Sequence, residues 1–200
     1  MNETQAREEI RFIQDMVEQT RKITAGSWMF FLIWGFAAVL GIAGMYVLVS
    51  LEMYNLIWLN WIGFMSIGVI FTMVYGRRQQ KACGARTYSQ GATAHLGFGC
   101  GIGFALAGFV LPMLKLYAWD VIPVIIALIA GIFVFSLGGV YDWSLLRWCG
   151  AFWWLGAVAM SLIHANYRSL LFIPLILIGY ILPALVLRSM YRKQSDDDDS

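Results

Sequence analysis

The chain has 200 residues, of which 60% are hydrophobic and 13% are charged, and its formal net charge is +2 at pH 7. Soluble domains contain about 25% charged residues, so this composition excludes an ordinary soluble protein. A separate soluble domain is excluded as well, because the apolar segments described below take up most of the chain.

Residues 1–25 form the one segment with the pattern of a soluble amphipathic helix. Apolar residues recur at spacings of three and four, and Ile10, Ile13 and Val17 lie at the centre of that stripe. The opposite face carries both signs of charge, so it lacks the basic face of a helix that binds anionic lipid. We therefore expect these three side chains to contact protein. That protein is either the chain's own bundle or a partner chain, including a second copy in a homo-oligomer.

Six uncharged stretches follow, at residues 23–51, 53–76, 87–114, 121–141, 148–167 and 169–187. Each has 19 to 29 residues, and a helix needs about 20 apolar residues to cross a hydrocarbon core roughly 30 Å thick. The predicted fold class is all-α: a polytopic membrane bundle of six transmembrane helices in three hairpins, preceded by an amphipathic cytoplasmic helix. A three-plus-three inverted repeat is equally allowed by the number of spans.

The predicted domains are the cytoplasmic helix at 1–25, the six-helix transmembrane domain at 26–188 and a cytoplasmic tail at 189–200. The tail contains four consecutive aspartates, a block of like charge that predicts disorder.

Basic residues lie mainly on one side of the predicted membrane. If the N-terminus is cytoplasmic, only Lys115 and Arg168 fall on the outer side. The inner side collects Arg21, Lys22, Arg77, Arg78, Lys81, Arg86, Arg147, Arg188, Arg192 and Lys193. Cytoplasmic loops carry such an excess of Lys and Arg, so both termini are predicted to be cytoplasmic.

The third span alternates small and large residues, which gives the helix two small-residue faces. One face holds Gly97, Gly101, Ala105 and Gly108, and the other holds Gly99, Gly103 and Ala107. Small faces let membrane helices approach closely, so we expect this span to be central, between two neighbours. The alternative is that the glycine run unwinds to bind an ion or solute through its carbonyl groups.

Two local features carry structural predictions. Pro112 and Pro183 lie inside the third and sixth spans and should kink them, because proline cannot donate to the carbonyl four residues earlier. Asp142 and Arg147 flank a short turn and are expected to form a weak ion pair.

Polar side chains at depth are few. Asn60 is expected to make an interhelical hydrogen bond. The absence of intramembrane charge argues against a pump, a voltage sensor or a charge-lined channel. At the outer edge a set of polar residues could form a recognition mouth or merely a solvated rim, and the rim is favoured. These are Glu52, Asn55, Lys115, Asp120, His164, Asn166 and Arg168. Asn60 is a further possible ligand or mouth residue.

The spacing of Cys83, Cys100, Cys149 and His95 matches no compact metal-ligand motif, so no metal site is predicted. The cysteines are expected to be free thiols. No cofactor and no catalytic residue are predicted, since acid–base catalysis needs a positioned titratable group and the candidates lie at the edges.

Short motifs along the chain carry a resemblance to a protein family. They are Phe12-Ile13, Thr20-Arg21, Trp34-Gly35, Tyr75-Gly76-Arg77-Arg78, Asp142-Trp143, Leu146-Arg147-Trp148 and Gly179-Tyr180. On these residues the chain, over about residues 5–193, resembles a group of small uncharacterised bacterial inner-membrane proteins. The resemblance implies a bacterial origin, a place in the cytoplasmic (inner) membrane and a gene that sometimes lies beside a winged-helix regulator. It implies no activity.

The sequence thus favours a non-catalytic membrane protein that binds a protein partner through the N-terminal helix, or an apolar ligand or lipid within the bundle. The alternative is a transporter of a small or hydrophobic solute. Membrane lipid is an expected partner, and nucleic acid is not.

Overall fold

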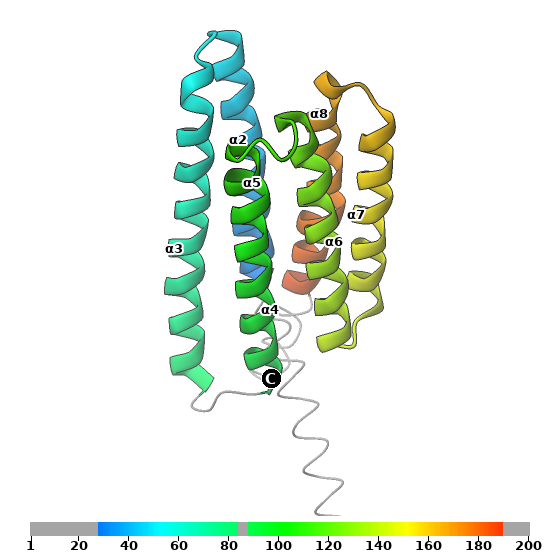
Figure 1. The fold of residues 1–200 in the computed structure, drawn as a ribbon. Helices are drawn as coiled ribbons and strands as arrows, with labels where there is room; N and C mark the ends of the chain where they lie inside the picture. Colours follow the sequence, from blue (N-terminus) through cyan, green and yellow to red (C-terminus); the bar gives the residue numbers. More distant parts are fainter. Residues whose placement is uncertain (1–27, 84–87, 190–200) are drawn as a thin grey trace, which may run out of the picture.

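The computed structural model describes residues 28–83 and 88–189, and every regular element in these two ranges is a helix (Figure 1). The long helices are α2 (Trp28–Ser50), α3 (Ile57–Cys83), α4 (Tyr88–Ala105), α6 (Ile122–Val140), α7 (Ser144–Leu162) and α8 (Ala165–Ile176). The shorter elements are the 3₁₀ turns η1 (Tyr54–Leu56) and η3 (Trp119–Val121), the π-helical turns η2 (Leu106–Val110) and η4 (Leu177–Ile181), and α5 (Leu111–Met113). After η4 the chain stays helical through Ser189.

Six helical segments are long and apolar enough to cross a membrane: Trp28–Ser50, Tyr54–Arg78, Gly91–Met113, Trp119–Val140, Ser144–Leu162 and Tyr167–Ser189. A chain with six such helices is a multi-pass integral membrane protein, so the predicted all-α, six-span class is confirmed. The predicted helix at 1–25 and the tail from residue 190 lie outside the described residues.

The core of the bundle lies between α6, α7 and α8 and is centred on Trp153. This side chain is 1% exposed, and Leu146, Met160 and Ile176 around it are fully buried. The rings of Trp153 and Phe172 pack edge to face, with their centroids 5.3 Å apart. In a bilayer, helix association is driven by van der Waals packing of this kind. The hydrophobic effect contributes little, because an apolar side chain that moves from lipid into a helix interface leaves an equally apolar environment.

Glycines bring α6 and α7 into close contact. A Cβ atom at Gly150 would lie 2.6 Å from the backbone nitrogen of Phe135, and one at Gly131 would lie 3.1 Å from the carbonyl oxygen of Gly150. The first distance is shorter than real Cβ contacts, and the second would require the neighbouring backbone to shift by a few tenths of an ångström. The two glycines therefore explain why α6 and α7 share the most extensive interface of the described helices.

The expected central position of the third span is wrong. Of the residues in its most apolar stretch, 11% are buried, against 39% for the fifth span. Its Gly97 and Gly103 face Phe133 and Ile129 of α6, and α4 packs mainly on that one helix.

Each of the two predicted small-residue faces has one glycine packed on α6, Gly97 or Gly103, and its other glycines are uncovered. Ideal Cβ atoms at Gly101, Gly108 and Gly99 would have open space around them, and Ala105 is exposed. Small residues permit close helix contact but do not by themselves supply the second neighbour.

The expected effect of Pro112 and Pro183 takes the form of two π-helical turns. The N–H of Leu111 donates to the carbonyl of Leu106, and the N–H of Leu182 donates to that of Leu177, each across five residues. The wider turn relieves the clash between a proline ring and the preceding turn of helix. The sixth span continues as a helix from Pro183 to Ser189, whereas the third ends at Met113, one residue after Pro112.

The turn between α6 and α7 confirms the predicted ion pair. Asp142 takes a left-handed conformation with φ 47°, and its carboxylate lies 3.2 Å from the guanidinium of Arg147. The Asp142 side chain is 94% exposed, so solvent screening leaves this pair worth less than about 1 kcal/mol.

Candidate functional site

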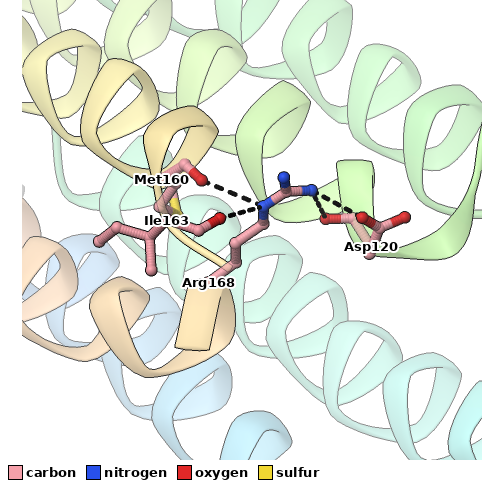
Figure 2. A network of polar contacts seen from close by, with 4 residues as sticks. All are labelled: Asp120, Met160, Ile163 and Arg168. Atoms are coloured by element: carbon pink, nitrogen blue, oxygen red, sulfur yellow. Dashed lines mark hydrogen bonds and ion pairs between the residues drawn. The ribbon is translucent and has the colours of Figure 1, made fainter. Parts of the chain in front are cut away.

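Arg168 organises one end of the bundle, the upper end in Figure 1, where the α2–α3, α5–α6 and α7–α8 connections lie. Its Nη1 donates to the carboxylate of Asp120 at 2.7 Å and to the backbone carbonyl of the same residue at 3.2 Å. Its Nε donates to the carbonyls of Met160 and Ile163 at 3.1 and 3.3 Å (Figure 2). One guanidinium thus ties the start of α8 to the end of α7 and to η3.

This network gives Asp120 a structural role. The Arg168 side chain is 17% exposed and that of Asp120 is 39% exposed, so the pair is partly shielded from water. The carboxylate of Asp120 already binds the guanidinium of Arg168, which lowers the capacity of Asp120 to bind a further ligand. The arrangement agrees with the interpretation of the polar edge as a rim.

The other proposed mouth residues lie on separate turns. Glu52 is exposed on the α2–α3 turn with φ 57°, and His164 is exposed on the α7–α8 turn. Figure 1 shows these two turns over different helix pairs. The side chain of Asn166 lies outside the described residues.

Asn60 links α3 to α2 rather than facing a cavity. Its Nδ2 donates to the carbonyl oxygen of Gly41 at 2.9 Å. Its Oδ1 lies 2.3 Å from the place where a Cβ of Gly44 would be, so glycine at 44 is what lets the amide fit. A second link joins the same helices, from the indole N–H of Trp34 to the hydroxyl of Thr72 at 3.1 Å.

Two side chains donate to carbonyls inside the π-helical turns. The Sγ of Cys149 donates to the carbonyl of Ile178 at 3.6 Å, and the hydroxyl of Tyr117 donates to the carbonyl of Ala107. Tyr117 lies between the third and fourth spans, and burial raises the pKa of its phenol above the usual 10.0. Across the described residues no three His, Cys, Asp or Glu side chains converge as a metal site.

The least covered part of the described bundle is formed by α3 and α4. On α4, Gly101, Ala105 and Gly108 follow one line at helical spacing, which we call the glycine groove. Phe98 stands beside it and is 73% exposed. The groove offers no titratable group, so its chemistry is limited to apolar contact.

The exposed side of α3 is equally apolar. Leu59 and Ile70 are 47% and 59% exposed, and the intervening Gly63 and Ser66 are exposed as well. We call these four residues the α3 face. Neither the α3 face nor the glycine groove is packed on a neighbouring helix as the surfaces of α7 are.

Comparisons of the chain with protein-family models, with curated proteins and with solved structures found no match. The resemblance to bacterial inner-membrane proteins therefore stays a prediction.

Two functional features escaped the sequence analysis. The anchoring role of Arg168 could have been suspected from its place at the start of the sixth span, opposite Asp120 at the start of the fourth. The Trp153 cluster could not, because Trp153 and Trp154 are adjacent in the sequence and nothing there marks Trp153 as the buried one.

Proposed function

We propose that this membrane protein is non-catalytic and binds an apolar or amphiphilic molecule of the bilayer in the glycine groove of α4. The observation that carries the proposal is the open space at Gly101 and Gly108, beside the exposed ring of Phe98. A groove lined by glycine and alanine, next to a large aromatic ring, gives an acyl chain more contact than a flat helix surface does.

The chemistry of the surrounding surface supports an apolar ligand. The glycine groove and the α3 face contain no charged side chain, and a charged ligand at that depth would need a partner. The same composition supports a non-catalytic role, since no general acid or base lies beside the groove.

The proposal is tested with a diazirine-bearing phosphatidylcholine. The protein is purified in detergent, incubated with the probe, irradiated and analysed by intact mass and peptide mapping. We expect stoichiometric labelling on α4 near Phe98 that Gly101→Leu lowers at least fivefold. Gly99→Leu is the matched control, because Gly99 is also open but points to the other side of the helix. Equal labelling of the two variants would contradict the proposal.

The orientation in the membrane is part of the proposal. We place the end with Arg168 and Asp120 outside and both termini in the cytoplasm of a bacterium, because the basic residues collect at the opposite end. A single cysteine at the exposed Tyr54, in a cysteine-free background, should react with an impermeant maleimide on intact cells. Labelling of that site only after lysis would reverse the orientation.

A further inference from the structure

An 11-residue segment of the third span is repeated in the sixth. Residues 106–116 read Leu-Ala-Gly-Phe-Val-Leu-Pro-Met-Leu-Lys-Leu, and residues 177–187 read Leu-Ile-Gly-Tyr-Ile-Leu-Pro-Ala-Leu-Val-Leu. Six of the 11 positions are identical, including the glycine and the proline. In both copies the first five residues form the π-helical turn, as η2 and η4.

In both copies the proline leaves one backbone carbonyl without its backbone donor. In a π-helical turn the donor for a carbonyl comes from five residues further on, which for Ala107 and Ile178 would be Pro112 and Pro183. Proline has no N–H. Each of these carbonyls instead accepts from a side chain, Tyr117 in the first copy and Cys149 in the second. Both donors lie outside the repeated segments, so this correspondence extends beyond the identical residues.

The two copies run in opposite directions through the bundle, since α4 rises and α8 descends in Figure 1. They are three spans apart. This is the relation expected of two inverted three-helix repeats, here residues 28–113 and 119–189. The contacts between the halves correspond too: α2 packs on α8 and η4, and α6 packs on α4 and η2.

The halves differ in the contact between their second and third helices, which is extensive in the second half alone. In the second half an ideal Cβ of Gly179 lies 2.0 Å from Nε1 of Trp153, and one of Gly156 lies 2.3 Å from the side chain of Leu175. Gly179 corresponds to Gly108 in the repeated segment, and Gly108 has open space. The surface of the sixth span around Gly179 is therefore covered by α7, whereas the corresponding surface around Gly108 in the third span is not covered by α3.

The middle helices show the same difference. Their registers are matched by the turns before them, where Glu52 and Asp142 both have positive φ, of 57° and 47°. Counting from these residues, the α3 face corresponds to a set of residues on α7 that are all buried. These are Cys149, Trp153, Gly156 and Met160.

We infer that the transmembrane domain is an inverted repeat seen with its first half open, and that α3 closes on α4 as α7 packs on α8, bringing Gly63 opposite Gly108. The two glycines lie at matching depth. Gly63 is six residues after the start of α3 at Ile57, and Gly108 is five residues before the end of α5 at Met113. At about 1.5 Å per residue both lie within about 10 Å of these helix ends, which are on the same side of the bundle.

This inference rests on the proposed function in one respect: closure covers the glycine groove and expels the molecule bound there. A groove that alternately opens to the bilayer and closes is a device for moving a hydrophobic solute. It makes the protein a carrier of that solute rather than a static receptor.

The test is cysteine cross-linking in a background whose native cysteines are replaced by alanine. In this background Cys149 is replaced by serine instead, which keeps a donor for the carbonyl of Ile178. In membranes treated with copper phenanthroline, Gly63→Cys with Gly108→Cys should form an intramolecular disulfide in most molecules, seen as a mobility shift of the monomer. Gly63→Cys with Gly101→Cys provides a second pair, because it corresponds to the ring contact of Trp153 with Phe172. Open space at Gly63, Gly101 and Gly108 lets all three cysteines fit the present conformation.

The matched control is Met65→Cys with Leu106→Cys. Their counterparts, Leu155 and Leu177, are 68% and 48% exposed, so this pair should stay reduced although it lies at similar depth. Cross-linking of the control at the same rate would overturn closure, as would no cross-link in either glycine pair. A covalent dimer in place of the shifted monomer would overturn it too, because a second copy would then cover these faces.

The cross-link forms without a ligand, so the experiments test closure of α3 on α4 and binding in the glycine groove independently. Absent labelling by the phosphatidylcholine probe would end the binding proposal and leave closure standing. In the cross-linked Gly63→Cys, Gly108→Cys protein, labelling near Phe98 is expected to fall at least fivefold relative to the same protein after reduction. Unchanged labelling would overturn the link between closure and release.

Discussion

The thiol of Cys149 on α7 lies 3.6 Å from the carbonyl oxygen of Ile178, the carbonyl that Pro183 leaves without a backbone donor. Cys149 is 4% exposed. A cysteine that the sequence presents as an inert apolar residue thus supports the π-helical turn of the neighbouring span.

Cys149→Ala should lower the stability by about 1–2 kcal/mol, because it leaves a buried carbonyl unsatisfied and a small cavity beside it. Cys149→Ser keeps a donor and should recover part of the loss. Thermal unfolding in detergent measures both, with Cys100→Ala as the control from a less buried cysteine. A serine variant less stable than the alanine variant would mean that the contact is only steric.

Gly179 and Gly108 occupy the same position of the repeated segment, which makes them a matched pair. Gly179→Ala should cost roughly 1–3 kcal/mol, since its Cβ would collide with the indole of Trp153. Gly108→Ala should change the free energy of unfolding by less than about 0.5 kcal/mol, as its Cβ meets open space. The melting temperatures of the two variants in detergent provide the comparison. A similar loss for both would place a neighbour over Gly108 in the resting protein.

Arg168 should matter more than its ion pair with Asp120. Arg168→Ala removes the donor to the carbonyls of Met160 and Ile163 as well as the charge pair, and we expect a cost of about 1–3 kcal/mol. Asp120→Asn keeps an acceptor for Nη1 and should cost less than about 1 kcal/mol. The free energy of unfolding, measured at low and high salt, separates the ion pair from the hydrogen bonds to backbone carbonyls, because those hydrogen bonds respond little to ionic strength. If Asp120→Asn is the more damaging change, the ion pair dominates the network.

The N-terminal helix remains a prediction from the sequence alone. Replacing Ile10, Ile13 and Val17 together by serine should leave the six spans inserted, since insertion depends on their own hydrophobicity. It should expose the segment to trypsin at Arg11 and Arg21 and dissociate any oligomer held by that face. Unchanged proteolysis together with unchanged assembly would show that the stripe docks on nothing.

The sequence by itself determined the number and placement of the spans. Charge-free stretches of 19 to 29 residues predict membrane-spanning helices, because an uncharged helix of that length is stable in hydrocarbon and costly to expose to water. It also predicted the ion pair between Asp142 and Arg147, which depends on residues five apart. Local chemistry was enough for each of these features.

Which helices pack most closely is known only from the tertiary structure. The glycines of α4 suggested a central helix, yet the closest approach to another helix is made by Gly179 in the second half of the chain. All these glycines have the same local properties. What distinguishes them is the side chain that another helix brings within reach, such as Trp153 beside Gly179, and in a bilayer apolar periodicity does not tell a helix face that meets protein from one that meets lipid.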